Sequence, residues 1–332
     1  MCNGTIMDKL ISFSIPLMLS GILQLMFNAV DIVVVGRFSG SQALAAVGST
    51  TALINVFTNL FIGISLGANV LAARYYAAGK TKEMSETVHT AIALALVSGV
   101  AMAVIGVVFA RGALEIMGTP DDVIAKSTLY MRIYFCGMPF FMMYNYGAAI
   151  LRAVGDTRRP LYFLFAAGAV NVVLNLFFVI QLGMGVDGVG WATVISECVS
   201  AGLIIRSLMK ENGAMKLHLT KLRIVSGKLT QIVRVGLPAG MQGAIFSISN
   251  VLIQSSVNSF GSIAMAGNTA SSNIEGFVYT AMNAVYQTSL SFTSQNLGGK
   301  KYSRIDKIKN ICLGVVTVVG LILGLGAVFG GK

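Results

Sequence analysis

Long apolar runs recur along the chain, and short polar segments that hold most of the charge separate them. A helix needs roughly 20 mostly apolar residues to cross a bilayer. The runs lack the short alternating pattern of membrane strands, so we predict an all-α polytopic membrane protein. Pro139 lies inside the fourth run and predicts a kink there. The expected spans are about 12–35, 44–72, 88–110, 129–151, 161–181, 186–208, 236–258, 266–292 and 308–329.

The basic residues are distributed unevenly between the two sides of this predicted bundle. Eighteen Lys and Arg residues fall in the loops after the second, fourth, sixth and eighth spans, and four fall in the remaining loops. Cytoplasmic loops carry the excess of Lys and Arg. We therefore expect a multi-pass protein of the cell membrane with a cytoplasmic N-terminus.

The composition supports a membrane protein and argues against several other classes of protein. The chain has 332 residues, of which 55% are hydrophobic and 11% are charged, too little charge for the surface of a soluble domain. The net charge of +11 would suit nucleic-acid binding, but the membrane topology already explains it, so we expect no nucleic-acid partner. The four cysteines are scattered singly, which favours neither a disulfide framework nor a zinc site. The histidines are not paired with a nucleophile, and we expect no enzyme activity.

The chain repeats weakly. Pro16 and Gly48 in the first part correspond to Pro238 and Gly267, about 220 residues later. An even number of helices in each unit predicts two parallel repeats. We expect an N-lobe of six helices (1–210), an amphipathic cytoplasmic linker helix (211–235) and the first three helices of a C-lobe (236–332). Two complete units would need about 440 residues, so we expect the chain to be part of a longer protein.

Asp31 is the clearest ionisable residue inside a predicted span. It shares one face of the first helix with Gln24 and Asn28. Carboxylates in the hydrocarbon region are costly and indicate function by default. A desolvated carboxylate can hold a proton or exchange it for a sodium ion. The alternative is a carboxylate near the water interface that only caps the helix or extends to water.

The fifth and sixth spans carry further oxygen-bearing side chains, at helical spacing. Asn171 and Asn175 lie one turn apart, and so do Thr193 and Glu197. Hard cations prefer carboxylate, amide and hydroxyl oxygens. If the helices converge, Asp31, Asn171, Asn175 and Thr193 would supply a possible Na⁺ site; the alternative is interhelical hydrogen bonding. Glu197 could equally lie near an interface.

The eighth span is unusually polar on one side. Glu275, Tyr279, Met282 and Tyr286 lie close together on a helix and would suit an amphipathic organic cation through charge and aromatic contacts. Contact between such a polar face and lipid acyl chains is unfavourable, so we expect the face to line a cavity or to pack against other helices. With Gln24 and Asn28, these four residues form the predicted substrate cavity.

Several segments resemble the MATE (multidrug and toxic compound extrusion) family, in particular its bacterial DinF-like branch. The resemblance covers essentially the whole chain and implies two six-helix bundles around a central cavity, with antiport of drugs against Na⁺ or H⁺ and no other cofactor. Asp31, Asn171 and Thr193 match the family's N-lobe cation site, whereas Asn175 stands where many members have a second Asp. The segments are PLMLSGILQLMFNAVDIVVVGRF, LRAVGDTRRP, NVVLNLFFV, GVGWATVIS, VGLPAGMQ and QNLGGKKYSR.

The resulting functional prediction is a monomeric antiporter that exports small organic cations. A flippase for lipid-linked precursors shares the fold, but it would need a cationic cavity for phosphates, whereas the spans here contain Asp31 and Glu275. A truncated chain without transport activity is the remaining alternative.

Overall fold

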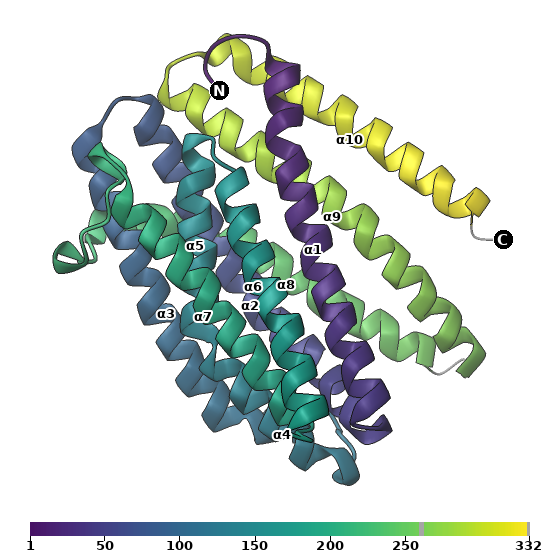
Figure 1. Ribbon diagram of the computed structural model, residues 1–332. Helices are drawn as coiled ribbons and strands as arrows, with labels where there is room; N and C mark the ends of the chain where they lie inside the picture. The colour runs from purple at the N-terminus through teal and green to yellow at the C-terminus, as the bar shows by residue number, and fades with distance from the viewer. Residues whose placement is uncertain (259–261, 331–332) are drawn as a thin grey trace.

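The computed structural model describes residues 1–258 and 262–330, and this part of the chain is built from helices (Figure 1). Long helices occupy all nine predicted spans, and the fourth span is divided into two helices. The helices are α1 (Ile6–Phe38), α2 (Ser41–Ala77), α3 (Thr81–Ile116), α4 (Asp121–Cys136), α5 (Met138–Val154), α6 (Arg158–Leu176) with a π-helical end (Phe177–Gln181), α7 (Val186–Lys210), α8 (Ser226–Asn258), α9 (Ser262–Gly298) and α10 (Tyr302–Gly330).

Seven helical segments of the described chain are long and apolar enough to cross a membrane: α1, α2, α3, α6 with its π-helical end, α7, α8 and α10. The α4–α5 pair and α9 are the two predicted spans outside this set. Neither α4 with 16 residues nor α5 with 17 reaches spanning length alone. The chain is thus a multi-pass membrane protein.

The break between α4 and α5 lies at Gly137, next to Pro139. Proline has no N–H to donate within a helix, and the chain turns here through a hydrogen bond of 2.9 Å from the Gly137 N–H to the Tyr134 carbonyl. A Cβ built on Gly99 of α3 would come within 2.5 Å of the Pro139 Cα, so α3 packs tightly against the break. The predicted span is thus interrupted two residues before Pro139, where the kink was expected.

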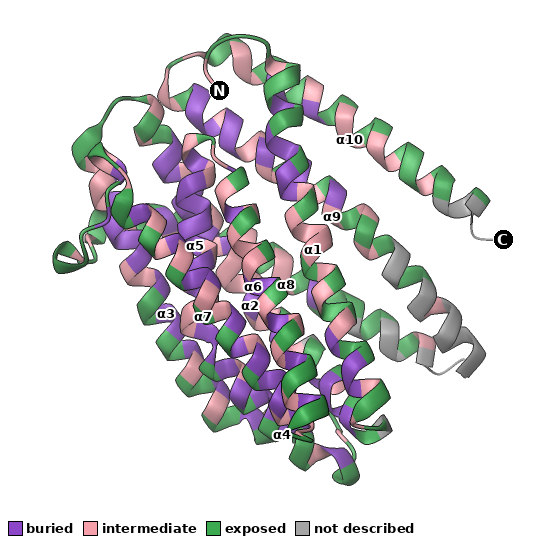
Figure 2. Cartoon of the chain, viewed as in Figure 1, coloured by how far each residue is buried: buried purple, intermediate pink, exposed green. Residues whose placement is uncertain are grey.

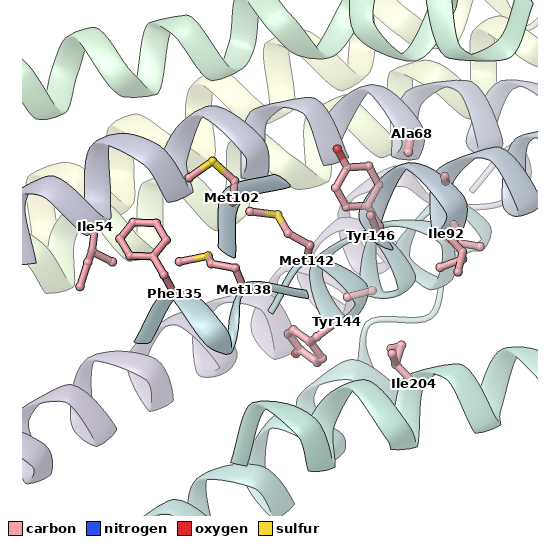
Figure 3. Close-up of a cluster of buried hydrophobic side chains, with 14 of the residues drawn as sticks. Ile54, Ala68, Ile92, Met102, Phe135, Met138, Met142, Tyr144, Tyr146 and Ile204 are labelled. Atoms are coloured by element: carbon pink, nitrogen blue, oxygen red, sulfur yellow. The ribbon is translucent and has the colours of Figure 1, made fainter. Parts of the chain in front are cut away.

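Most of the apolar core lies between α2, α3, α4, α5 and α7 (Figure 3). Phe135, Met138, Met142 and Tyr146 from the α4–α5 region are fully buried there. A smaller cluster joins α1, α9 and α10, where the rings of Phe13 and Phe292 meet edge to face at 5.6 Å. Figure 2 shows the resulting contrast, with burial concentrated in the bundle before α8 and sparse along α10.

Glycines allow α8 to approach α2 closely. A Cβ on Gly63 would collide with the backbone of Gly240, and a Cβ on Gly67 would collide with the Ile232 carbonyl oxygen. Small residues permit this kind of backbone contact between helices in membranes. This contact joins α8 to the bundle that the preceding helices form.

The C-terminal half of α9 uses its polar side chains to bind neighbouring helices. Ser291 donates a hydrogen bond of 3.0 Å to the Asn69 amide oxygen, and Gln295 donates one of 2.6 Å to the Ala153 carbonyl. Thr288 shares a hydrogen bond of 2.8 Å with Ser14 of α1. The polarity of this half of α9 is therefore explained by packing against α1, α2 and α5.

The helix predicted over the linker 211–235 is found only from Ser226, where α8 begins; residues 211–225 do not form it. Between α7 and α8 the structure has two 3₁₀ turns, Gly213–Met215 and Leu219–Lys221, and α8 begins only at Ser226. Two backbone N–H groups of this segment bind side chains of α3: His218 donates to His89 Nε2 at 3.1 Å, and Val225 donates to Thr90 Oγ1 at 3.2 Å. The segment is fastened to α3 by these bonds.

Candidate cation-coupling site

Asp31 lies near the end of α1, where α1 packs against α6. The two helices approach closely at Gly168, where an added Cβ would collide with the Phe27 ring one turn before Asp31. Asp31 is 9% exposed, and Asn171 and Asn175 of α6 are 5% and 0% exposed. The packing of α1 on α6 therefore places a carboxylate opposite two buried amides.

Asn175 connects the three side chains. Its amide nitrogen donates one hydrogen bond to the Asp31 carboxylate and another, of 3.1 Å, to the Asn171 carbonyl oxygen. The prediction that the first and fifth spans converge at these residues agrees with this geometry.

The carbonyl oxygen of Asn175 is buried, and no group in residues 1–258 or 262–330 donates a hydrogen bond to it. Because buried acceptors are nearly always satisfied, such an atom needs an explanation. It lies on the same amide that binds Asp31, so a carboxylate and an unsatisfied carbonyl oxygen occur at one place. These are the ligand types that a hard cation such as Na⁺ prefers, and the residues present fit a small cation on this ground.

The site contains one carboxylate. Among the described residues, no group of three or more His, Cys, Asp or Glu side chains is placed to hold a metal ion. One charged oxygen with neutral amide oxygens favours a monovalent ion or a proton over a divalent metal, which would need more charge for neutralisation.

Thr193 is positioned differently from the other three predicted ligands. It is half-buried on α7, and its hydroxyl donates a hydrogen bond of 3.0 Å to the Val189 carbonyl of its own helix. No hydrogen bond joins it to Asp31 in the part of the chain that the structure describes. The site that the structure assembles through hydrogen bonds thus consists of Asp31, Asn171 and Asn175.

Tyr130 of α4 was missed by the sequence reasoning. It is buried, with 7% of the residue exposed. Its ring packs near Gly190 of α7, where a Cβ would come within 3.6 Å of its Cδ2. The signal in the sequence is the i, i+4 pair of Tyr130 and Tyr134 inside a predicted span.

The predicted substrate-cavity residues are accessible on α1 and α9. Gln24, Asn28 and Glu275 are exposed, and Tyr279, Met282 and Tyr286 are 52%, 37% and 47% exposed. These two helices touch nearby, since a Cβ on Gly21 of α1 would collide with Thr280 of α9. Polar side chains exposed on membrane helices must face water or protein and not acyl chains.

Tyr279 is held in place by α8. Its ring stacks on Phe246 with the centroids 5.6 Å apart and the planes 8° from parallel. The middle of α9 therefore presents a stacked aromatic ring one turn from Glu275, in contrast to its C-terminal half, where the polar side chains bind other helices.

The fold and the buried carboxylate define the class of the protein, a helical membrane protein with an ionisable residue in its interior. The family model described as MatE matches residues 16–177 and 238–331. The chain belongs to the MATE family, whose members are transporters and not enzymes.

Named relatives support this assignment. The chain is 30% identical over 320 residues to the "Probable multidrug resistance protein YoeA" of Bacillus subtilis, a match that covers 94% of the chain and 69% of the relative. It is 22% identical to the "FAD transporter" of Shewanella oneidensis, over 96% of the chain and 72% of the relative. The chain spans 66 to 69% of the length of two Bacillus subtilis relatives.

The fold also matches solved structures. One is the "Outward-facing conformation of a multidrug resistance MATE family transporter of the MOP superfamily", with a TM-score of 0.91 and 22% sequence identity. The match covers 99% of the chain and 73% of that structure. The predicted fold class is confirmed.

Proposed function

We propose that this chain exports small organic cations in exchange for Na⁺ or H⁺, and that Asp31 binds the coupling ion. The observation that supports this most is the buried carboxylate of Asp31 beside the unsatisfied carbonyl oxygen of Asn175. A site of this kind alternates between a charged carboxylate that binds a cation and a neutral, protonated carboxyl.

The protein's own residues account for the two states. When Asp31 is ionised, the Asn175 amide stabilises the charge by a hydrogen bond. When Asp31 is neutral, the desolvation penalty of the buried charge disappears. A ligand that binds one of two conformations more tightly shifts the population toward it, so ion binding at Asp31 and drug binding at the exposed face of α9 can be coupled through the position of α1.

Cationic cargo is favoured by the charges of the predicted cavity. Glu275 is its only formal charge among Gln24, Asn28, Glu275, Tyr279, Met282 and Tyr286, and the Tyr279 and Tyr286 rings can bind a cation on their faces. Anionic cargo is the second candidate, since one relative is named as an FAD transporter. Competition between a fluorescent organic cation and a flavin nucleotide distinguishes the two.

The test is efflux of a fluorescent organic cation from vesicles that contain the full chain. We expect Asp31→Asn to abolish ion-driven efflux while the protein remains in the membrane, because an amide cannot alternate between charged and neutral forms. Asp121→Asn is the matched control, since Asp121 is exposed in the first turn of α4 and should not affect efflux. Efflux by Asp31→Asn at the wild-type rate would refute the proposal.

A further inference from the structure

The segment between α7 and α8 (residues 211–225) lies against the first turns of α3 (Figure 1). Met215 and Leu217 anchor it, since they are 8% and 2% exposed and belong to the main apolar core. Because the segment joins α7 to α8, two helices of spanning length, it lies near the interface between membrane and water. It is therefore an ordered surface element at the depth of the lipid headgroups.

A cavity of about 480 Å³ opens between this segment and α3. Two cationic side chains of the segment, Lys221 and Arg223, line it, and Glu86 of α3 is the one acidic residue in its wall. The remaining lining residues are Ser85, His89, Thr220 and Leu222. The cavity therefore has more positive than negative charge in its wall.

Glu86 does not balance the cations around it. Its carboxylate oxygens lie 3.9 Å from Arg223 Nη2 and 3.9 Å from Lys228 Nζ, so one acid is shared by two bases. The Lys228 ammonium is held elsewhere as well, by a hydrogen bond of 3.0 Å to the Tyr75 hydroxyl. In residues 1–258 and 262–330, the Lys221 ammonium forms no hydrogen bond or ion pair. The cavity can thus accept an anionic group without first breaking a close ion pair.

Apolar side chains flank the cationic ones. Leu219 and Ile224 are 50% and 41% exposed, and they stand two residues before Lys221 and one residue after Arg223. A small water-soluble anion would leave both apolar side chains in water. A phospholipid offers a phosphate for the cations and acyl chains for the apolar side chains, and basic residues beside membrane helices attract anionic lipids.

We propose that this cavity binds the headgroup phosphate of an anionic phospholipid, with Lys221 and Arg223 as the cationic contacts. The guanidinium can donate two parallel hydrogen bonds to the phosphate oxygens, and the ammonium acts as a point charge. Leu219 and Ile224 contact the acyl chains. The bound lipid holds the segment against α3, because it contacts the segment on the side that faces the membrane. The proposal is independent of the antiport proposed above.

Native mass spectrometry of the full chain, titrated with phosphatidylglycerol or phosphatidylcholine, tests this binding. We expect the wild-type protein to prefer phosphatidylglycerol, and Lys221→Gln combined with Arg223→Gln to lower that affinity at least about tenfold. Arg158→Gln combined with Lys307→Gln is the matched control, because it removes the same two charges from exposed positions on α6 and α10. Equal phosphatidylglycerol affinities in the two double variants would overturn the proposal.

Glu86→Gln separates binding in the cavity from a general disturbance of the segment. It removes the negative charge that faces the two cations, so we expect phosphatidylglycerol to bind more tightly than to the wild-type protein. A disturbed segment would instead bind the lipid more weakly. An affinity equal to or below that of the wild-type protein would contradict an anion in this cavity.

Amide hydrogen exchange distinguishes a lipid from a free anion. In vesicles of phosphatidylcholine, added phosphatidylglycerol should raise the protection of residues 213–225 in the wild-type chain and leave it unchanged in the Lys221→Gln and Arg223→Gln double variant. Inorganic phosphate in phosphatidylcholine vesicles should give no protection. If inorganic phosphate protected the segment as well as phosphatidylglycerol does, the assignment to a lipid would be overturned.

Discussion

Asn175 donates one side-chain N–H to Asp31 on a different helix and the other to Asn171 one turn away. A single amide therefore binds the carboxylate and leaves its own carbonyl oxygen buried and unsatisfied. This relationship supports the proposed cation site, since the amide oxygen is a ligand that the helix packing has already desolvated.

The first prediction concerns the charge of this site. Asn175→Asp places a second carboxylate beside Asp31, and two adjacent carboxylates bind a cation more strongly than one. We expect the apparent Na⁺ affinity to rise at least about tenfold, equivalent to ~1.4 kcal/mol. Thermal stabilisation of the purified protein by Na⁺ measures this change. Asn171→Asp is the comparison. If Na⁺ did not raise the unfolding temperature of Asn175→Asp, this result would contradict a cation site here.

The contact between α2 and α8 provides a stability prediction. A Cβ on Gly240 would collide with the Leu60 carbonyl oxygen, so Gly240→Ala must push the two helices apart. We expect a loss of about 1–3 kcal/mol in the free energy of unfolding. Gly243→Ala is the matched control on the same helix, because its Cβ would lie at an ordinary 3.4 Å from the Asn59 Cβ. Equal unfolding temperatures for the two variants would contradict the tight packing.

The segment between α7 and α8 should respond to pH through its histidines. The His218 ring stacks parallel to His89 at 6.3 Å, and burial, followed by Lys221, Lys216 and His89, lowers the pKa of His218 from its ordinary value of 6.5. The unfolded or released segment then binds protons more readily than the docked one. Docking is therefore strongest above about pH 6.5 and weakens as the pH falls below it.

Amide hydrogen exchange in residues 213–225 tests this prediction, after correction for the intrinsic effect of pH. We expect protection to decrease between about pH 7.5 and about pH 5.5. His218→Asn removes the titrating ring and should make protection independent of pH in this range. If protection of residues 213–225 fell equally with pH in His218→Asn, the loss would be due to a group other than His218.

The sequence was sufficient for most of the fold. Apolar runs of spanning length locate all nine long helical segments, because backbone groups in lipid must bond within the segment. The kink at Pro139 follows from the missing N–H of proline. The closeness of Asp31 to Asn171 and Asn175 was predicted because helical spacing and the family resemblance agreed.

Other features depend on tertiary contacts that periodicity does not encode. The linker was predicted as an amphipathic helix, but α3 side chains bind backbone N–H groups of its first part, and the helix begins only at Ser226. Thr193 has a ligand-type hydroxyl, yet its own helix accepts the hydrogen bond. The position of Tyr130 depends on which helices are neighbours, and the spacing of residues within one helix does not reveal this. The boundaries of the two predicted lobes remain a prediction.

The most direct test of the central claim is the counter-ion flux that accompanies drug export by the full chain in sealed proteoliposomes. Inward movement of protons or of isotopically labelled Na⁺, followed as an organic-cation gradient is imposed, reports coupling directly. We predict a drug-dependent flux of one of these ions in the wild-type protein and none in Asp31→Asn, with Asp121→Asn unchanged. A drug-dependent ion flux of equal size in Asp31→Asn would contradict the account.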